Sequence, residues 1–186
     1  MPNWCANILN VSGPPELVED FDRRFKGRPA CWPMSIHEIC TLMRRRAASV
    51  AKVLLKEGDF EPTYCFNALY PVPDDVVESG YDPAGYCWCA THWGTKWDVA
   101  GDVVLHSHHP GFCSYLFKTA WSPPERWLAY VAQTFPNLTF ELLWCEPGMQ
   151  IAGSYLYKDG QLVESWSPSI AEEYNRFVEE EFGWEG

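Results

Sequence analysis

The sequence lacks the features that mark membrane, secreted and low-complexity proteins. No apolar run approaches the roughly 20 residues that a helix needs to cross a bilayer. The first 13 residues have neither the basic start nor the long apolar stretch of a secretory signal peptide. No segment is low in complexity, and no pattern repeats at a fixed period. We therefore expect a globular protein of the cytoplasm.

Disulfide bonds are not expected, although the chain contains eight cysteines. An even number of cysteines would suggest disulfides in a secreted protein, but nothing in this sequence directs export. We interpret the cysteines as reduced thiols, most of which fill small spaces in a core.

Positive charge is scarce, and the net charge of −11 is unevenly distributed. Residues 1–60 contain nine Lys/Arg against seven Asp/Glu, whereas residues 61–186 contain five against eighteen. Such a field repels nucleic acid, and the chain lacks an RNP-type motif, so an RNA-binding role is disfavoured. The acidic balance predicts solubility first, and it also suits contact with a basic partner protein.

The chain opens with a predicted strand and helix. Residues 7–12 alternate as a strand that Gly13-Pro14-Pro15 ends. Apolar residues then recur at intervals of four, which indicates one buried face of a helix. These residues are Leu17, Phe21 and Phe25.

A long insert is predicted to follow the first helix. After a loop broken by Gly and Pro, Ser35 and Glu38 form a capping-box pattern that starts a second helix, which runs to about Lys56. Residues 57–84 indicate an irregular arm. Within that arm, residues 65–70 suggest a short extended piece.

A β-hairpin is predicted next. Residues 103–106 and 112–121 flank His108-His109-Pro110-Gly111, a turn-forming sequence. In the second strand, alternate residues from Cys113 to Trp121 share one face, and those from Ser114 to Ala120 share the other.

The sequence Ser122-Pro123-Pro124-Glu125 predicts the start of another helix. Ser122 would be the N-cap, Pro123 would take the first helical position, and Glu125 would close a capping box. The inward-facing residues of this helix would be Leu128, Val131, Ala132 and Phe135.

The remaining pattern predicts a strand, a hairpin and a helix. Residues 138–144 alternate as a half-buried strand, and residues 151–165 form a hairpin around Asp159-Gly160, a type I′ turn signal. A last helix starts at a Ser169 cap and ends at Gly183.

With the insert removed, the predicted order is β-α-β-β-α-β, which is the ferredoxin-like or split β-α-β arrangement. We therefore predict an α+β fold in which residues 1–186 form one ferredoxin-like domain. Residues 26–84 would be a helical and irregular insert, and a C-terminal hairpin and helix would extend the fold.

Residues 86–98 combine three tryptophans with polar and charged groups, and a second tryptophan-bearing segment lies at 117–124. A Trp-rich loop must either pack down or serve as a recognition surface. Its rings offer stacking faces, and its lysine offers a cation for a phosphate or carboxylate, so a nucleotide-like ligand would suit it. The predicted ligand-binding residues are Trp88, Trp93, Thr95, Lys96, Trp97, Asp98 and Trp121.

Packing is the alternative explanation for the same tryptophans. They would then form a satellite core that anchors the irregular arm, with Lys96 and Asp98 facing solvent.

Cysteines and histidines raise two further alternatives, a zinc site and a nucleophilic enzyme. Cys87, Cys89 and His92 lie close together, but Cys-x-Cys lacks the usual zinc-knuckle spacing. A zinc site would also need the second cluster to converge on the first. With Asp98, the same three residues supply the types of a Cys-His-Asp triad. The residues of the second cluster are His106, His108, His109 and Cys113.

We predict no catalytic residue, metal or cofactor. A Cys/His-dependent or zinc-dependent enzyme built around Cys87, Cys89 and His92 stays as the alternative.

One face of the last helix is strongly acidic, so it suits contact with a basic protein. The predicted protein-binding residues are Glu172, Glu173, Glu179, Glu180 and Glu181.

Several fragments resemble the YubB-like family of small plasmid- and phage-encoded proteins of unknown function. The fragments are residues 1–7 (Met-Pro-Asn-Trp-Cys-Ala-Asn), 93–98 (Trp-Gly-Thr-Lys-Trp-Asp), 119–124 (Thr-Ala-Trp-Ser-Pro-Pro) and Ala152-Gly153. The family has Asn before Trp-Gly-Thr, where this chain has His92. The resemblance implies a ferredoxin-like domain and a mobile-element origin, and it brings no established catalytic residues.

These observations together predict a non-enzymatic binding protein of a phage or plasmid. It would act on a host protein or sequester a small ligand, and the mobile-element origin implies counter-defence in a bacterial host. No membrane or nucleic-acid partner is predicted.

Overall fold

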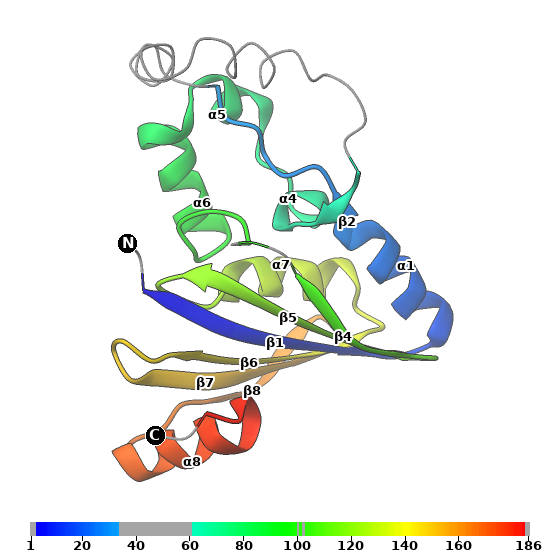
Figure 1. Cartoon of the computed structure of the whole chain (residues 1–186). Coiled ribbons are helices and arrows are strands. Elements are labelled where there is room, and N and C mark those ends of the chain that lie inside the picture. The colour runs from blue at the N-terminus through cyan, green and yellow to red at the C-terminus, as the bar shows by residue number, and fades with distance from the viewer. Residues whose placement is uncertain (1–2, 34–60, 100, 102, 185–186) are drawn as a thin grey trace.

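The computed structural model describes residues 3–33, 61–99, 101 and 103–184. Within them, six strands form one antiparallel sheet in the order β4-β5-β1-β6-β7-β8 (Figure 1). The strands are β1 (Trp4–Ser12), β4 (Val104–His109), β5 (Phe112–Ala120), β6 (Thr139–Glu146), β7 (Ile151–Lys158) and β8 (Gln161–Trp166).

Two helices connect the first four of these strands. Helix α1 (Pro15–Phe25) follows β1, and α7 (Glu125–Thr134) follows β5. The chain thus runs β1-α1-β4-β5-α7-β6, with β1 between β5 and β6 in the sheet. This order confirms the predicted α+β, ferredoxin-like fold with its C-terminal hairpin and helix.

The main core lies between the sheet and the layer containing α1 and α7. Alternate residues of the central strands face this layer, as a period of two requires. From β1 these are Cys5, Leu9 and Val11. The predicted inward residues of α7 are all buried, and α1 contributes Val18, Phe21 and Phe25.

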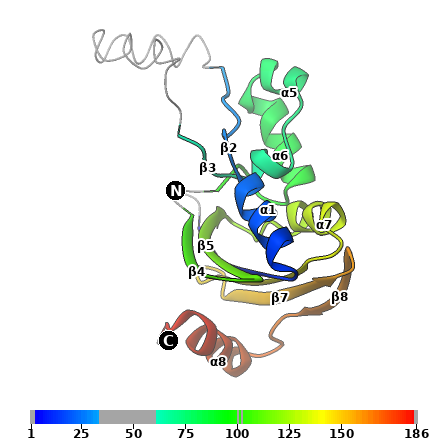
Figure 2. The same cartoon turned by 90° about the vertical axis from the view of Figure 1, so that its right-hand side faces the viewer.

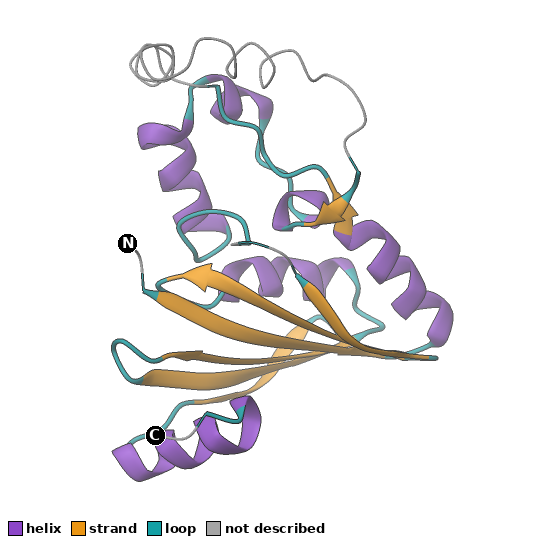
Figure 3. Ribbon diagram, in the orientation of Figure 1, coloured by secondary structure: helices purple, strands orange, loops and turns teal. Residues whose placement is uncertain are grey.

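The described segments between α1 and β4 pack on this same side of the sheet. It contains the short paired strands β2 (Lys26–Gly27) and β3 (Thr63–Tyr64). Short helical segments follow, as Figure 3 shows. They are α4 (Phe66–Leu69), α5 (Asp74–Glu78), the π-helical turn η1 (Tyr81–Gly85) and α6 (Tyr86–His92).

Helix α8 (Ala171–Phe182) lies on the opposite side of the sheet from α1 and α7, as Figure 2 shows. Tyr174 and Val178 of α8 pack in a small second core with Ala6, Cys145 and Ala152. These three small side chains let the helix approach the sheet closely. The predicted C-terminal end is confirmed, because Gly183 adopts a left-handed φ of 65° after the last turn.

The predicted capping box at Ser122 is wrong. Helix α7 begins at Glu125, and no side chain caps it. The backbone explains the difference, because a residue before proline avoids helical angles, so Pro123 cannot begin the helix ahead of Pro124. The Ser122 hydroxyl instead donates a hydrogen bond of 2.6 Å to the Gly94 carbonyl.

The Ser169 cap is also displaced. Ile170 occupies the N-cap position of α8, without a side-chain cap. The Ser169 backbone N–H donates to the Glu173 carboxylate at 2.8 Å, so a glutamate, not the serine hydroxyl, satisfies a backbone group at this end.

Two local predictions were wrong, one in the insert and one in the Trp-rich segment. A third prediction concerns residues that the structure does not describe. The extended piece at 65–70 contains helix α4, and the Trp-rich segment begins as helix α6 instead of a loop. The predicted second helix, Ser35 to Lys56, lies outside the residues that the structure describes.

Within those residues, no helix has both the length and the apolar character needed to span a membrane.

Candidate functional site

Trp93 belongs to the core instead of a ligand surface. Its side chain is 1% exposed. The ring lies 5.8 Å from Phe66 and 5.3 Å from Trp88, both nearly edge-on. Its indole N–H donates to the Tyr70 carbonyl at 3.0 Å. This arrangement ties the insert to the sheet domain, but Trp93 belongs to the main core, whereas the packing explanation predicted a satellite core.

Thr95 and Asp98 also make internal bonds. The Thr95 hydroxyl donates to the Ala120 carbonyl at 3.2 Å. The Asp98 carboxylate accepts from the backbone N–H groups of Phe66 at 2.6 Å and Asn67 at 3.3 Å. It therefore caps the first turn of α4 from a distant part of the chain. Asp98 does not face open solvent, which corrects that part of the packing explanation.

The environment of Asp98 shifts its acidity. Burial raises the pKa of the carboxyl from 3.8 to about 6, and the three backbone N–H donors, with Val99 N at 2.8 Å, limit the rise.

Three residues of the Trp-rich segment, the exposed Tyr86 and the half-buried Lys96 and Trp97, lie beside the exposed Trp4 of β1. We call these four residues the aromatic patch. The Lys96 ammonium lies 5.0 Å from the Trp97 ring and 5.7 Å from the Tyr86 ring. Trp97 in turn lies 6.4 Å from Trp4. Lys96 and Trp97 were among the ligand-binding residues predicted from the sequence. Trp4 and Tyr86 were not, because no local spacing connects them to the other two.

The other two predicted aromatic residues lie apart from these contacts. Trp88 is half-buried, with its ring stacked on His92 at 4.5 Å. Trp121 is 45% exposed and follows β5 with a φ of 71°, and its backbone N–H donates to the Asn3 carbonyl at 3.0 Å.

The geometry gives the Cys/His alternative no support. Cys87 is exposed, whereas Cys89 is buried and burial raises the pKa of its thiol to about 12. A nucleophilic cysteine needs the opposite shift. The His92 Nδ1–H donates to the Trp88 carbonyl at 2.9 Å, and Asp98 caps α4. Among the described residues, no cluster of three Cys, His, Asp or Glu groups is placed to hold a metal ion.

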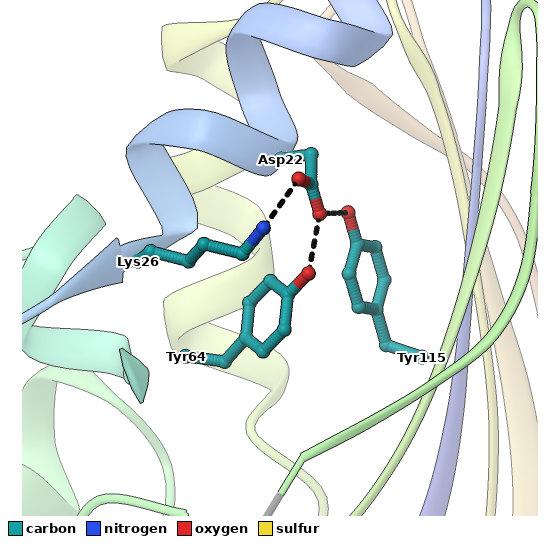
Figure 4. A network of polar contacts seen from close by, with 4 residues as sticks. All are labelled: Asp22, Lys26, Tyr64 and Tyr115. Atoms are coloured by element: carbon teal, nitrogen blue, oxygen red, sulfur yellow. Dashed lines mark hydrogen bonds and ion pairs between the residues drawn. The ribbon is translucent and has the colours of Figure 1, made fainter. Parts of the chain in front are cut away.

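A polar network that the sequence analysis missed joins α1, β3 and β5 (Figure 4). Asp22 accepts from Tyr64 at 2.7 Å, from Tyr115 at 2.9 Å and from Lys26 at 2.8 Å. The i,i+4 spacing of Asp22 and Lys26 was the available signal. Nothing local indicates that tyrosines from two other elements converge on them.

The contacts of the network favour a charged Asp22 and neutral tyrosines. Burial alone would raise the pKa of Asp22, but the three donors outweigh it and lower that pKa. Burial and the Asp22 carboxylate raise the pKa of Tyr64 to about 12 and raise that of Tyr115 as well. A charged carboxylate and two neutral phenols suit a structural link better than proton transfer.

The predicted acidic residues lie along α8. Glu172, Glu179, Glu180 and Glu181 are exposed, and Glu173 is half-buried. Within the described chain, no glutamate of α8 takes part in an ion pair.

The histidines of the second cluster lie on β4, at the edge of the sheet. His106, His108 and His109 are exposed, whereas Cys113 of β5 is buried.

Three of the fragments quoted above converge around the start of β1. Asn7 donates to the Thr119 hydroxyl at 2.9 Å. The Gly94 carbonyl accepts a hydrogen bond from the Ser122 hydroxyl. The Trp93 carbonyl accepts one from the backbone N–H of Trp127 at 3.2 Å. The fragments therefore lie together because they build one junction between the insert and the sheet.

The comparisons with known proteins agree with the fold. The chain is similar to a crystal structure of a protein api92 from Yersinia pseudotuberculosis, with 11% identity and a TM-score of 0.65. That similarity covers 92% of this chain and 99% of the other, and at this identity it shows the fold alone. No curated protein matches. Residues 92–183 match the family model described as the ferredoxin-like domain in Api92-like protein, so the C-terminal part of the chain is similar to that domain.

Proposed function

We propose that this chain is a non-enzymatic binding protein that holds a basic partner protein against α8. The observation that carries the proposal is the row of exposed carboxylates on α8, none of which is paired within the described chain. Exposed charge of one sign speeds association with a partner of opposite charge and favours it over acidic competitors.

The resemblance to YubB-like proteins supports a mobile-element origin. On that basis we propose a host protein as the partner and counter-defence as the role. Burial of Cys89, which raises the pKa of its thiol, argues against that residue as a nucleophile.

Charge reversal on α8 should weaken partner capture. We expect the triple variant E179K/E180K/E181K to reduce affinity for the host partner by about tenfold, since three rim charges contribute about 0.5 kcal/mol each. The measurement is quantitative pull-down from the host, followed by titration of the captured protein.

The matched control is D74K/D75K/E78K, which changes the charge equally at exposed positions of α5. Helix α5 lies on the other side of the sheet from α8 (Figure 2). Equal binding by wild type and the α8 variant would contradict the proposal.

A small ligand at the aromatic patch is the second candidate function. The specific observation is the position of the Lys96 ammonium beside two partly exposed rings, which suits a flat anionic group. We expect K96A and W97A each to weaken binding of an adenine nucleotide such as ATP about tenfold. Isothermal titration measures this, with K118A as the control lysine on β5. Absence of nucleotide binding by wild type would exclude this ligand class.

A further inference from the structure

Helix α8 covers only part of its side of the sheet. Each of four neighbouring strands contributes one apolar residue to a row beside it. Val104 pairs with Leu116, Leu116 with Ile8, and Ile8 with Leu143. Adjacent strands lie about 4.8 Å apart, so this row is about 14 Å long. We call the depression over it the sheet groove.

The sheet groove is bounded by the end of α8. Phe182, Trp184 and Glu181 line the same hollow as the apolar row, and its volume is about 550 Å³. Lys118 and His106 also line it. The floor is accessible: Val104 is 53% exposed, and Ile8 and Leu116 are half-buried although they lie on strands inside the sheet or next to its edge.

The width of the uncovered strands is close to the diameter of one helix. A helix with its side chains is about 10–12 Å across, and strands β4, β5 and β1 together span about 10 Å. The opposite side of the sheet carries α1 and α7, whereas α8 is the one helix on this side within the residues that the structure describes (Figures 1 and 2). An apolar floor one helix wide is the usual site for the apolar stripe of an amphipathic helix.

The charged side chains in and beside the groove indicate which kind of partner it could bind. An occupant lying beside α8 meets one acidic and one basic side chain in the groove, Glu181 and Lys118. The exposed Glu179 and Glu180 on the same helix make the balance acidic. The net charge of −11 opposes a second copy of this chain at that position. A partner with Lys or Arg beside its apolar stripe satisfies both surfaces.

We infer that the sheet groove binds a basic amphipathic helix of the partner protein, laid beside α8 with its apolar stripe on Val104, Leu116 and Ile8. This inference rests on the proposed function, that α8 holds a basic protein, and it adds the form of the bound segment and the apolar half of its contact surface.

Model peptides test the inference with the full chain. The probes are fluorescein-labelled 18-residue helices of Leu and Lys with one apolar stripe, the same composition in scrambled order, and a Leu/Glu version. We expect fluorescence anisotropy to show binding of the amphipathic Leu/Lys peptide, binding at least about tenfold weaker for the scrambled peptide, and none for the acidic one.

Two valine substitutions provide a matched comparison. Val104 and Val163 lie on the two edge strands, β4 and β8, and are 53% and 54% exposed. V104N removes a groove contact, whereas V163N makes the same change outside the groove, and neither alters the charge. We expect V104N to weaken peptide binding about tenfold and V163N to leave it unchanged. L116A is the second groove variant, and thermal unfolding checks that each variant folds.

The outcomes separate this inference from the proposed function. Equal peptide binding by V104N, L116A and wild type would overturn the groove, while loss of binding by E179K/E180K/E181K would still support α8 as the contact. No peptide binding by wild type would also overturn the inference and leave the host pull-down to decide the proposed function. Concentration-dependent dimerisation that V104N abolishes would assign the groove to a second copy instead.

Discussion

Replacing Trp93 by alanine is expected to lower the free energy of unfolding by about 3–5 kcal/mol, the usual range for deleting a large buried aromatic. Trp93 is nearly fully buried between Phe66 and Trp88. Its removal also leaves the Tyr70 carbonyl without the indole donor. Urea denaturation followed by circular dichroism at pH 7 measures the change.

Trp97 is the matched control, because it lies in the same segment but is half-buried in the aromatic patch instead of fully buried in the core. We expect W97A to change the free energy of unfolding by less than about 1 kcal/mol. W93F refills part of the cavity, so its loss should be smaller than that of W93A and should keep the protein measurable if W93A fails to fold. Equal effects of W93A and W97A would show that the assignment of core and surface within this segment is wrong.

The strand pattern was the most predictable part of the fold. Alternation from Cys113 to Thr119 grouped the residues of one face of β5, and the structure shows that this face is buried. Asp159-Gly160 identified the β7–β8 hairpin for a similarly local reason: both residues adopt positive φ, 52° and 73°.

Contacts between distant segments were the least predictable part. Ser122 and Asp98 each carry a capping side chain, but Ser122 bonds to Gly94, and Asp98 caps a helix that starts 32 residues earlier in the chain. Sequence spacing predicts only local partners, whereas a buried backbone group accepts any donor or acceptor that the tertiary structure supplies. For the same reason, the sequence could not show that Trp93 is fully buried whereas Trp88 and Trp97 are only half-buried.

Only one part of the sheet groove could be inferred from the sequence. The sequence grouped Leu116 with Ser114 and Lys118 on one face of its strand, without assigning that face to the core or to solvent. An apolar residue on an outer face is common and predicts no site by itself. Its meaning depends on the register that aligns it with Val104, Ile8 and Leu143, and on α8 leaving all of that row except Leu143 accessible.

Replacing Asp22 by asparagine is expected to lower the free energy of unfolding by about 2–3 kcal/mol at pH 7, because hydrogen bonds to a charged group are stronger than neutral ones. The carboxylate accepts from Lys26, Tyr64 and Tyr115, and an amide cannot accept from all three. Y115F removes one donor and leaves the ion pair with Lys26, so its effect should be smaller. Urea denaturation of the three proteins measures the series.

The pH dependence gives the same network a second, independent test, with Asp98 as the opposite case. The pKa of Asp22 is lowered on folding, so its stabilising contribution is complete above about pH 4 and disappears as the pH falls below that value. The pKa of Asp98 is raised from 3.8 to about 6, so the folded state holds its proton more tightly. The contribution of Asp98 is therefore greatest below about pH 4 and declines as the pH rises to 6.

Between pH 4 and 6 the two variants should consequently behave differently. The stability difference between wild type and D98N should shrink as the pH rises, whereas the difference between wild type and D22N should stay constant there and shrink only in more acidic solution. Urea midpoints at half-unit intervals from pH 3 to 7 resolve both trends. If the D22N difference moved with that of D98N between pH 4 and 6, Asp22 would not be the strongly bonded carboxylate that links α1, β3 and β5.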